Sequence, residues 1–252
     1  AIAFLATLTY GCVAVPILHE FKAEQVHNIV NHSEARLLFA GDYVWPTLTP
    51  DEMPGIEGII HMPDFALKVS RSERLSEARA RLNEFFGRKY PERFTADDVH
   101  YVPQPDGEVL CMINYTSGST GNPKGVMIPY RALWSNYQFA IEVLGSTCKS
   151  GDRVVSMLPM AHMYGMAFEF LFEFLHGIHI HFLNRLPSPK IIVQAFAEVK
   201  PCIVIAVPLI IEKIIRKNVL PKVQTHTMQM LLRMPVVKGK ILEKIRFEIQ
   251  KV

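Results

Sequence analysis

A loop of ten residues, TSGSTGNPKG at positions 116–125, constrains the fold of this chain more than any other feature. An apolar extended segment at 109–115 leads into the loop, and a second one at 125–128 leaves it ahead of a helical pattern at 130–144. Glycines in the loop let the backbone turn sharply and bring its N–H groups close to a polyanion. The pattern therefore predicts a strand, a phosphate-binding loop, a second strand and a helix.

Hydroxyl and lysine side chains in this loop add to the backbone donors. Four hydroxyl groups and the ammonium group of Lys124 within ten residues are hard to explain as an ordinary surface turn. In the P-loop of kinases and GTPases, glycine directly precedes the lysine and a hydroxyl residue follows it. Here Pro123 precedes Lys124 and Gly125 follows it, which counts against an ordinary P-loop NTPase. The residues expected to bind phosphate are Thr116, Ser117, Gly118, Ser119, Thr120, Gly121 and Lys124.

Helical and extended patterns alternate along the rest of the chain. We predict helices at 1–11, 22–32, 70–94, 165–176 and 209–217, and strands at 12–15, 35–40, 58–61, 153–158, 178–183 and 202–207. Arg and Glu alternate in the segment 70–94, which indicates a solvated helical face. The alternation of elements is typical of an α/β fold with largely parallel sheets flanked by helices. A basic amphipathic helix at 237–252 needs a partner for its apolar face, either another part of the protein or a membrane surface.

Composition and charge argue against several classes of protein. With 49% hydrophobic and 20% charged residues, the chain is globular rather than disordered. The net charge is +3 without a block of like charges, so no patch for nucleic acid stands out. The uncharged run at 1–18 approaches the length of a membrane span. Because Gly11 and Pro16 interrupt it and no basic flank precedes it, we interpret it as a buried helix and strand.

Cysteine and histidine positions give no zinc-binding pattern. The four cysteines lie far apart in the sequence, as is typical of a reduced, intracellular protein; they are Cys12, Cys111, Cys148 and Cys202. His179 and His181 share one face of a predicted strand with no acidic or thiol neighbour, so we expect them at a sheet margin rather than at a metal. Phenylalanines at 168, 170, 172 and 174 are expected to pack in a core, with a lipid-facing acyl tunnel as the alternative.

Two segments resemble the adenylate-forming superfamily, which includes acyl-CoA synthetases, adenylation domains and luciferases. YTSGSTGNPKGVM at 115–127 is similar to the signature loop of that family. SMLPMAHMYGMAF at 156–168 is similar to the family segment beside the carboxylate substrate, in the form found in fatty acyl-CoA synthetases. FLATLTYGCVAVPI, NHSEARLLFAG and KPCIVIAVPLIIEKI show weaker similarity in the same order along the chain. The resemblance therefore spans nearly the whole chain.

The resemblance implies an ATP-dependent acid–thiol ligase of the long-chain fatty acid–CoA type. A carboxylate would attack the α-phosphorus of ATP to give an acyl-adenylate and pyrophosphate, and coenzyme A would then take the acyl group. Lys124 and Thr116 would be the catalytic residues, stabilising charge on the departing phosphates, with Mg²⁺ held in part by Thr116. His162 would line the acid pocket, with Tyr164 and Gly165 beside it.

The resemblance also predicts which part of the enzyme this chain contains. Residues 1–152 would form a first α/β subdomain of the large N-terminal domain, and residues 153–252 the start of a second. The family's downstream glutamate, TGD and C-terminal lysine motifs do not occur in the sequence, so a C-terminal domain is expected to be absent. We therefore expect this chain to be catalytically incomplete by itself.

Several alternatives stay open from the sequence. The parent could be an amino-acid or aryl-acid adenylating domain, or a nucleotide-binding scaffold that has lost catalysis. The expected partners are a small carboxylic acid and ATP, without nucleic acid; peripheral membrane contact and an oligomer are left open. The expected location is the cytoplasm, with the inner face of the membrane as the alternative.

Overall fold

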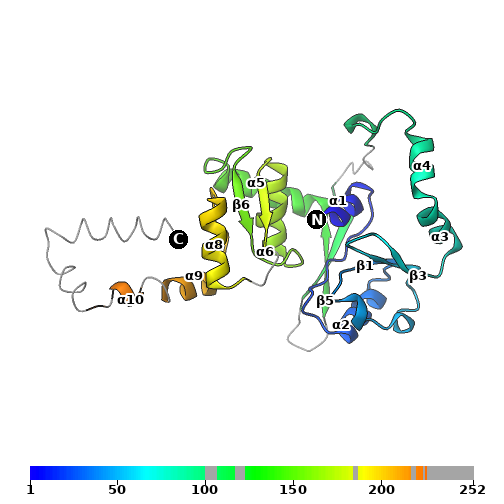
Figure 1. Cartoon of the computed structure of the whole chain (residues 1–252), viewed down its shortest axis with the longest axis horizontal. Helices are drawn as coiled ribbons and strands as arrows, with labels where there is room; N and C mark the ends of the chain where they lie inside the picture. Colours follow the sequence, from blue (N-terminus) through cyan, green and yellow to red (C-terminus); the bar gives the residue numbers. More distant parts are fainter. Residues whose placement is uncertain (100–106, 117–122, 184–186, 217–219, 224, 226–252) are drawn as a thin grey trace. The chain divides into compact units, whose positions relative to one another are not determined.

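The computed structural model describes residues 1–99, 107–116, 123–183, 187–216, 220–223 and 225 (Figure 1). The chain forms two compact units, Ala1–Trp134 and Ser135–Val252, which we describe separately. The boundary falls inside helix α5 (Tyr130–Leu144), because its second half packs Ala140 with Val154 and Phe172. The sequence interpretation divided the chain after residue 152, and that division into subdomains stays a prediction.

A three-stranded sheet and helix α2 (Ala23–His32) form the core of the first unit. Strand β1 (Leu37–Ala40) pairs in parallel with β2 (Gly58–His61), and β2 pairs antiparallel with β3 (Leu67–Ser70). The turns η1 (Trp45–Thr47) and η2 (Pro50–Glu52) connect β1 to β2. Apolar residues three and four positions apart form one face of α2, and this face packs on the sheet. The buried core consists of Val26, Val30, Ala40, Leu48, Met53, Ile56 and Ile59.

The first unit also contains the antiparallel pair formed by β4 (Leu110–Thr116) and β5 (Lys124–Pro129), which runs directly into α5. Helix α1 (Ile2–Thr9) precedes residues 12–15, which were predicted as a strand. In the structure this segment makes a single parallel bridge, from Ala14 to Met112. Helix α1 is tied to the start of α5, which follows β5 directly, since the Tyr130 hydroxyl donates to the Leu8 carbonyl at 2.6 Å.

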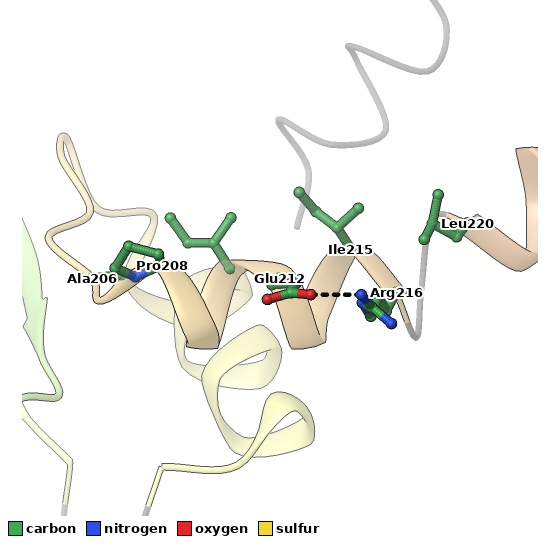
Figure 2. A pocket seen from close by; sticks show the side chains of 7 residues that line it. Ala206, Pro208, Glu212, Ile215, Arg216 and Leu220 are labelled. Carbon is green, nitrogen blue, oxygen red and sulfur yellow. Dashed lines mark ion pairs between the residues drawn. The ribbon is translucent and has the colours of Figure 1, made fainter.

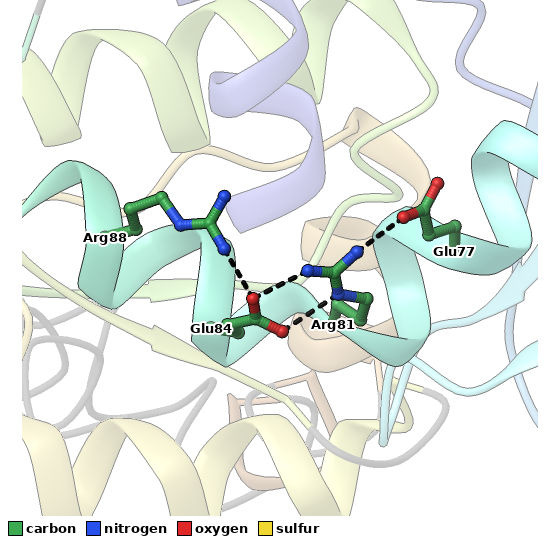
Figure 3. A network of polar contacts seen from close by, with 4 residues as sticks. All are labelled: Glu77, Arg81, Glu84 and Arg88. Carbon is green, nitrogen blue, oxygen red and sulfur yellow. Dashed lines mark hydrogen bonds and ion pairs between the residues drawn. The ribbon is translucent and has the colours of Figure 1, made fainter.

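Helices α3 (Glu73–Ala80) and α4 (Leu82–Lys89) carry the predicted solvated face. Neither helix has a buried residue, and four alternating charges pair along them (Figure 3). Arg81 contacts Glu77 and Glu84, and Arg88 also contacts Glu84. Because solvent screens exposed pairs of this kind, they add little to the stability of the fold. The turn η3 (Ala96–Asp98) follows.

The second unit is built on the parallel pair β6 (Arg153–Ser156) and β7 (His179–Phe182). Between them runs one helical stretch, α6 (Met163–Met166), the π-helical segment η4 (Ala167–Leu171) and α7 (Phe172–Leu175). The sequence predicted this helix at 165–176. Helices α8 (Pro189–Val199), α9 (Pro208–Ile214) and α10 (Leu220–Val223) follow. The buried core consists of Ala140, Cys148, Val154, Phe172 and Ile178.

The α/β class is confirmed, and two details of the expected fold are corrected. The described strands pair both ways, two pairs parallel and two antiparallel, because β3 and β5 follow their partners after connections too short for a parallel crossover. Residues 202–207, predicted as a strand, are irregular. The Cys202 N–H donates to the Arg153 carbonyl at 2.9 Å, but no ladder continues from there in the described residues.

Three further expectations from the sequence concern the two histidines of β7, the C-terminal segment and membrane-spanning helices. His179 and His181 lie exposed on β7, one of the two strands of its described sheet, as predicted for a sheet margin. The predicted amphipathic helix at 237–252 lies outside the described residues. Among those that are described, no helix is both long and apolar enough to span a membrane.

Candidate functional site

The two ends of the predicted phosphate loop are brought together by the β4–β5 pair. Thr116 ends β4 and Lys124 begins β5, and the two residues are register partners across the pair. Both are exposed, so a hydroxyl group and an ammonium group stand at the mouth of the loop. Ser117, Gly118, Ser119, Thr120 and Gly121 lie outside the described residues. The predicted strand–loop–strand–helix order is confirmed by the elements on either side.

The base of the loop is packed tightly around Gly125. A Cβ atom added to Gly125 would lie 2.9 Å from Ile113 Cγ2 and 3.1 Å from the Tyr115 ring carbon Cζ. Both distances are shorter than ordinary van der Waals contact, so only glycine fits without displacing a neighbour. The ring of Tyr115 therefore covers the strand that carries Lys124.

Tyr115 is in turn held by helix α2. Its hydroxyl lies 2.7 Å from Nδ1 of His32, and the two rings meet edge to face with centroids 5.7 Å apart. Burial raises the pKa of the Tyr115 phenol, and a hydrogen bond with Ser33 partly opposes that shift. A small cavity of about 230 Å³ opens here, lined by Asn28, Ile29, His32, Tyr115 and Pro123. It is smaller than most pockets for drug-sized ligands, which hold roughly 300–1,000 Å³.

The predicted acid-binding residues lie at the start of α6. His162 occupies the position before the helix, where its N–H donates to the Pro159 carbonyl at 3.0 Å and its carbonyl accepts from Met166 at 2.8 Å. His162 and Tyr164 are exposed, whereas Gly165 is buried. The structure thus brings the three residues together on one turn of helix. They belong to the second unit and the phosphate loop to the first.

Gly165 explains how closely the β6–α6 loop (residues 157–162) lies on this helix. A Cβ atom at Gly165 would lie 2.9 Å from the Pro159 carbonyl oxygen and 3.0 Å from Leu158 Cβ. Its role in the structure is therefore close packing against the loop that leads to His162.

A buried glutamate below the same loop was not predicted from the sequence. Glu169 is 1% exposed, and its Oε2 accepts hydrogen bonds from the N–H groups of Met157 at 2.9 Å and Leu158 at 2.7 Å. The Ser156 hydroxyl donates to the same oxygen at 3.3 Å. Burial raises the pKa of Glu169, and these three donors oppose the shift. The sequence did contain a signal for it, because Glu169 and Glu173 are the only charged residues of the apolar segment 165–175 and lie four residues apart.

Glu173, one turn further along, is the second member of that pair. It is 2% exposed, and its Oε2 has no hydrogen-bond partner among the described residues. Burial, reinforced by the charge of Glu169, raises the pKa of Glu173 to about 9. Glu173 is therefore a neutral carboxylic acid in the folded protein at pH 7.

A separate apolar groove runs along α9 (Figure 2). It encloses about 460 Å³ and is lined by Ala206, Pro208, Ile211, Glu212, Ile215, Arg216 and Leu220. The charged groups of Glu212 and Arg216 pair with each other at 2.8 Å. None of the predicted nucleotide- or acid-binding residues that the structure describes lines this groove.

The described residues contain no group of three or more His, Cys, Asp or Glu side chains placed to hold a metal ion. Thr116, the expected partner of Mg²⁺, offers an exposed hydroxyl oxygen, a type of atom that this hard cation accepts. With Lys124 opposite it, the mouth of the loop fits a polyanion and its counter-ion. The arrangement supplies donors for phosphate oxygens, without a complete metal site.

Comparisons with known proteins identify the relatives of this chain. The chain is 26% identical to long chain acyl-CoA synthetase 3 of Arabidopsis thaliana, covering 81% of this chain and 30% of that protein. It is 28% identical to the long-chain-fatty-acid–CoA ligase FadD15 of Mycobacterium bovis, covering 85% of this chain and 33% of that one. The chain thus spans about a third of the length of these relatives.

Solved structures share the fold. The N-terminal domain of FACL13 from Mycobacterium tuberculosis superposes with a TM-score of 0.61 at 23% identity, over 85% of this chain and 48% of that one. The expected relation to the N-terminal domain of adenylate-forming enzymes is thereby confirmed for the fold. Residues 1–245 match the family described as AMP-binding enzyme, and this chain belongs to that family.

Proposed function

We propose that this chain supplies the phosphate-binding part of an enzyme that joins a fatty acid to coenzyme A at the expense of ATP. One observation carries the proposal: in a member of the AMP-binding family, Thr116 and Lys124 face each other at the two ends of the glycine-rich loop. Relatives named as long-chain acyl-CoA synthetases support the choice of a fatty acid.

The chemistry of the loop would be electrostatic. When the acid carboxylate attacks the α-phosphorus of ATP, negative charge moves onto the departing β- and γ-phosphates. The Lys124 ammonium and the Thr116 hydroxyl would stabilise that charge, together with the loop between them. Bound Mg²⁺ would neutralise part of the same charge, and Thr116 would contribute one oxygen to it.

The acid would bind on the other unit. His162 and Tyr164 are exposed at the start of α6 and present an imidazole and a phenol to a carboxylate or an acyl chain. The tight packing of Gly165 on Pro159 supports the same assignment, because it fixes the turn from which both side chains project. In the second step the thiol of coenzyme A would take the acyl group from the adenylate.

Acid-dependent exchange between ATP and pyrophosphate tests this proposal. The full-length product of the gene should exchange with fatty acids and more weakly with amino acids or aryl acids, in the presence of Mg²⁺. The 252-residue chain alone should not, since it corresponds to only a third of its relatives. If exchange occurs only with amino acids or aryl acids, one of these classes is the acid substrate and the fatty acid is not. The absence of exchange with any acid would favour a non-catalytic scaffold.

A further inference from the structure

We propose that Glu169 is a positioning residue that holds the β6–α6 loop and thereby places His162 and Tyr164 for the acid. This inference rests on the proposed function, because it concerns the acid side of the same reaction. It assigns a task to a buried charge that neither the phosphate loop nor the acid-binding turn accounts for.

The first step is the hydrogen bonding at the start of the loop. Strand β6 ends at Ser156, so the next N–H groups, those of Met157 and Leu158, leave the strand ladder. Backbone N–H groups in a buried position need an acceptor. One carboxylate oxygen of Glu169 accepts both, at 2.9 and 2.7 Å. Because consecutive N–H groups converge on one oxygen, the direction in which the chain leaves β6 depends on Glu169.

The second step connects this anchor to His162. The loop contains only residues 157–162, and its far end is held by the helix it precedes, where Met166 donates to the His162 carbonyl at 2.8 Å. In between, Gly165 packs on Leu158 and Pro159. Glu169 and Gly165 therefore fix the near and middle parts of the loop on the same helical stretch that carries Tyr164.

The third step is the local geometry of the helix. Glu169 lies at the centre of the π-helical segment η4, between α6 and α7. Such segments widen one turn and redirect side chains, and they recur at functional sites. Here the residues beside Glu169 on the chain, Phe168 and Phe170, are aromatic, while the carboxylate of Glu169 meets the loop backbone. A carboxylate buried to this degree is costly unless hydrogen bonds compensate for its lost hydration, and the two loop N–H groups provide them.

Glu173 provides a matched control. It is buried to the same extent, lies one turn away on the same helical stretch, and carries the same chemical group. No described hydrogen bond joins it to the loop. A buried glutamate that is merely structural should therefore give the same result at either position.

The test is ATP–pyrophosphate exchange by the full-length gene product with palmitate as the acid, comparing Glu169→Ala, Glu169→Gln and Glu173→Gln. Glu169→Ala removes the acceptor of two N–H groups, those of the buried Met157 and the half-buried Leu158, and should raise the KM for palmitate about tenfold or more, with the KM for ATP within about twofold. Glu169→Gln should recover most of the loss, because its amide oxygen can accept the same two donors. Glu173→Gln should leave both KM values within about twofold.

Hydrogen exchange of the amides of Met157 and Leu158 should rise about tenfold or more in Glu169→Ala and not in Glu173→Gln.

If Glu169→Ala does not fold, Glu169→Asp takes its place, since the shorter side chain withdraws the carboxylate while keeping its charge. The KM for palmitate should again rise. Equal changes in both KM values of Glu169→Ala, or an equal rise of the KM for palmitate in Glu169→Ala and Glu173→Gln, would overturn the inference alone. No exchange by the wild type with any acid would overturn the proposed function, and the inference with it.

Discussion

The substitution Glu173→Gln should change how the stability of the second unit depends on pH. In the folded protein burial raises the pKa of Glu173 to about 9, whereas the carboxyl group of the unfolded chain titrates near 4.5. Between these values the folded form holds a proton that the unfolded form releases. The stability that Glu173 contributes is therefore full below pH 4.5 and falls as the pH rises toward 9.

The size of the effect follows from this window. Each pH unit inside it costs about 1.4 kcal/mol for one proton. Between pH 5.5 and 7.5, ionisation of the Glu173 carboxyl in the unfolded chain should thus lower the free energy of unfolding by about 3 kcal/mol at most. The total for an ordinary domain is about 5–15 kcal/mol. Glutamine has no proton to release, so this part of the slope should vanish in the variant.

Urea denaturation at pH 5.5, 6.5 and 7.5, read by pulsed hydrogen exchange of peptides from residues 153–175, measures this slope. Pulse labelling at a single pH keeps the readout comparable between conditions. The exposed residue Glu142 on α5 gives a matched control, and Glu142→Gln should follow the wild type. If the stability curves of the wild type and Glu173→Gln stay parallel across these pH values, the argument that Glu173 is buried as a neutral acid is refuted.

Two further predictions concern packing. The Sγ atoms of Cys148 and Cys202 lie 2.7 Å apart as free thiols, so a mild oxidant such as diamide should join them in a disulfide. Alkylation followed by peptide mapping without reduction measures this, and two thiols that both remain alkylatable would contradict the prediction. Gly125→Ala places a methyl group against the Tyr115 ring and should destabilise the β4–β5 pair by about 1–3 kcal/mol in thermal unfolding. Gly55→Ala, with open space around it, is the control, and equal losses for both would contradict the packing argument.

Elements with a strong periodic pattern could be predicted from the sequence. The helix at 130–144 has the bounds of α5, and the strands around the phosphate loop differ from β4 and β5 by at most a residue at each end. These segments combine a clear apolar period with glycine or proline at their borders. The resemblance to the adenylate-forming family supplied the fold of the whole chain, which such patterns alone left as a general α/β class.

Three elements were predicted wrongly or missed. Among the described residues, no strand pairs with the apolar run at 202–207 to extend the ladder, so its strand-like composition was misleading. Strand β3 was missed because the exposed, charged Lys68 stands in the middle of a weak apolar pattern. Helix α8 was missed although Ser188 caps its N-terminus and Pro189 stands at its first position, two signals that the sequence does show.

The parts of the site that arise from distant contacts were also invisible in the sequence. His32 and Tyr115 are 83 positions apart, yet they form the hydrogen bond that secures the base of the phosphate loop. Glu169 meets the loop at Met157 only because the helix turns back over the end of β6. Spacing rules describe neighbours within one element and give no information on such tertiary pairs.

The central claim, that the phosphate loop promotes loss of pyrophosphate, is tested most directly by exchanging one lysine in the full-length gene product. Lys124→Ala removes the ammonium group at the mouth of the loop, whereas Lys68→Ala removes an exposed lysine from β3 in the same unit. Acid-dependent ATP–pyrophosphate exchange should fall about 100-fold in Lys124→Ala, the usual loss for one group that stabilises a transition state, and stay within about twofold in Lys68→Ala. Exchange that is unchanged in Lys124→Ala, or lost equally in both variants, would contradict the account.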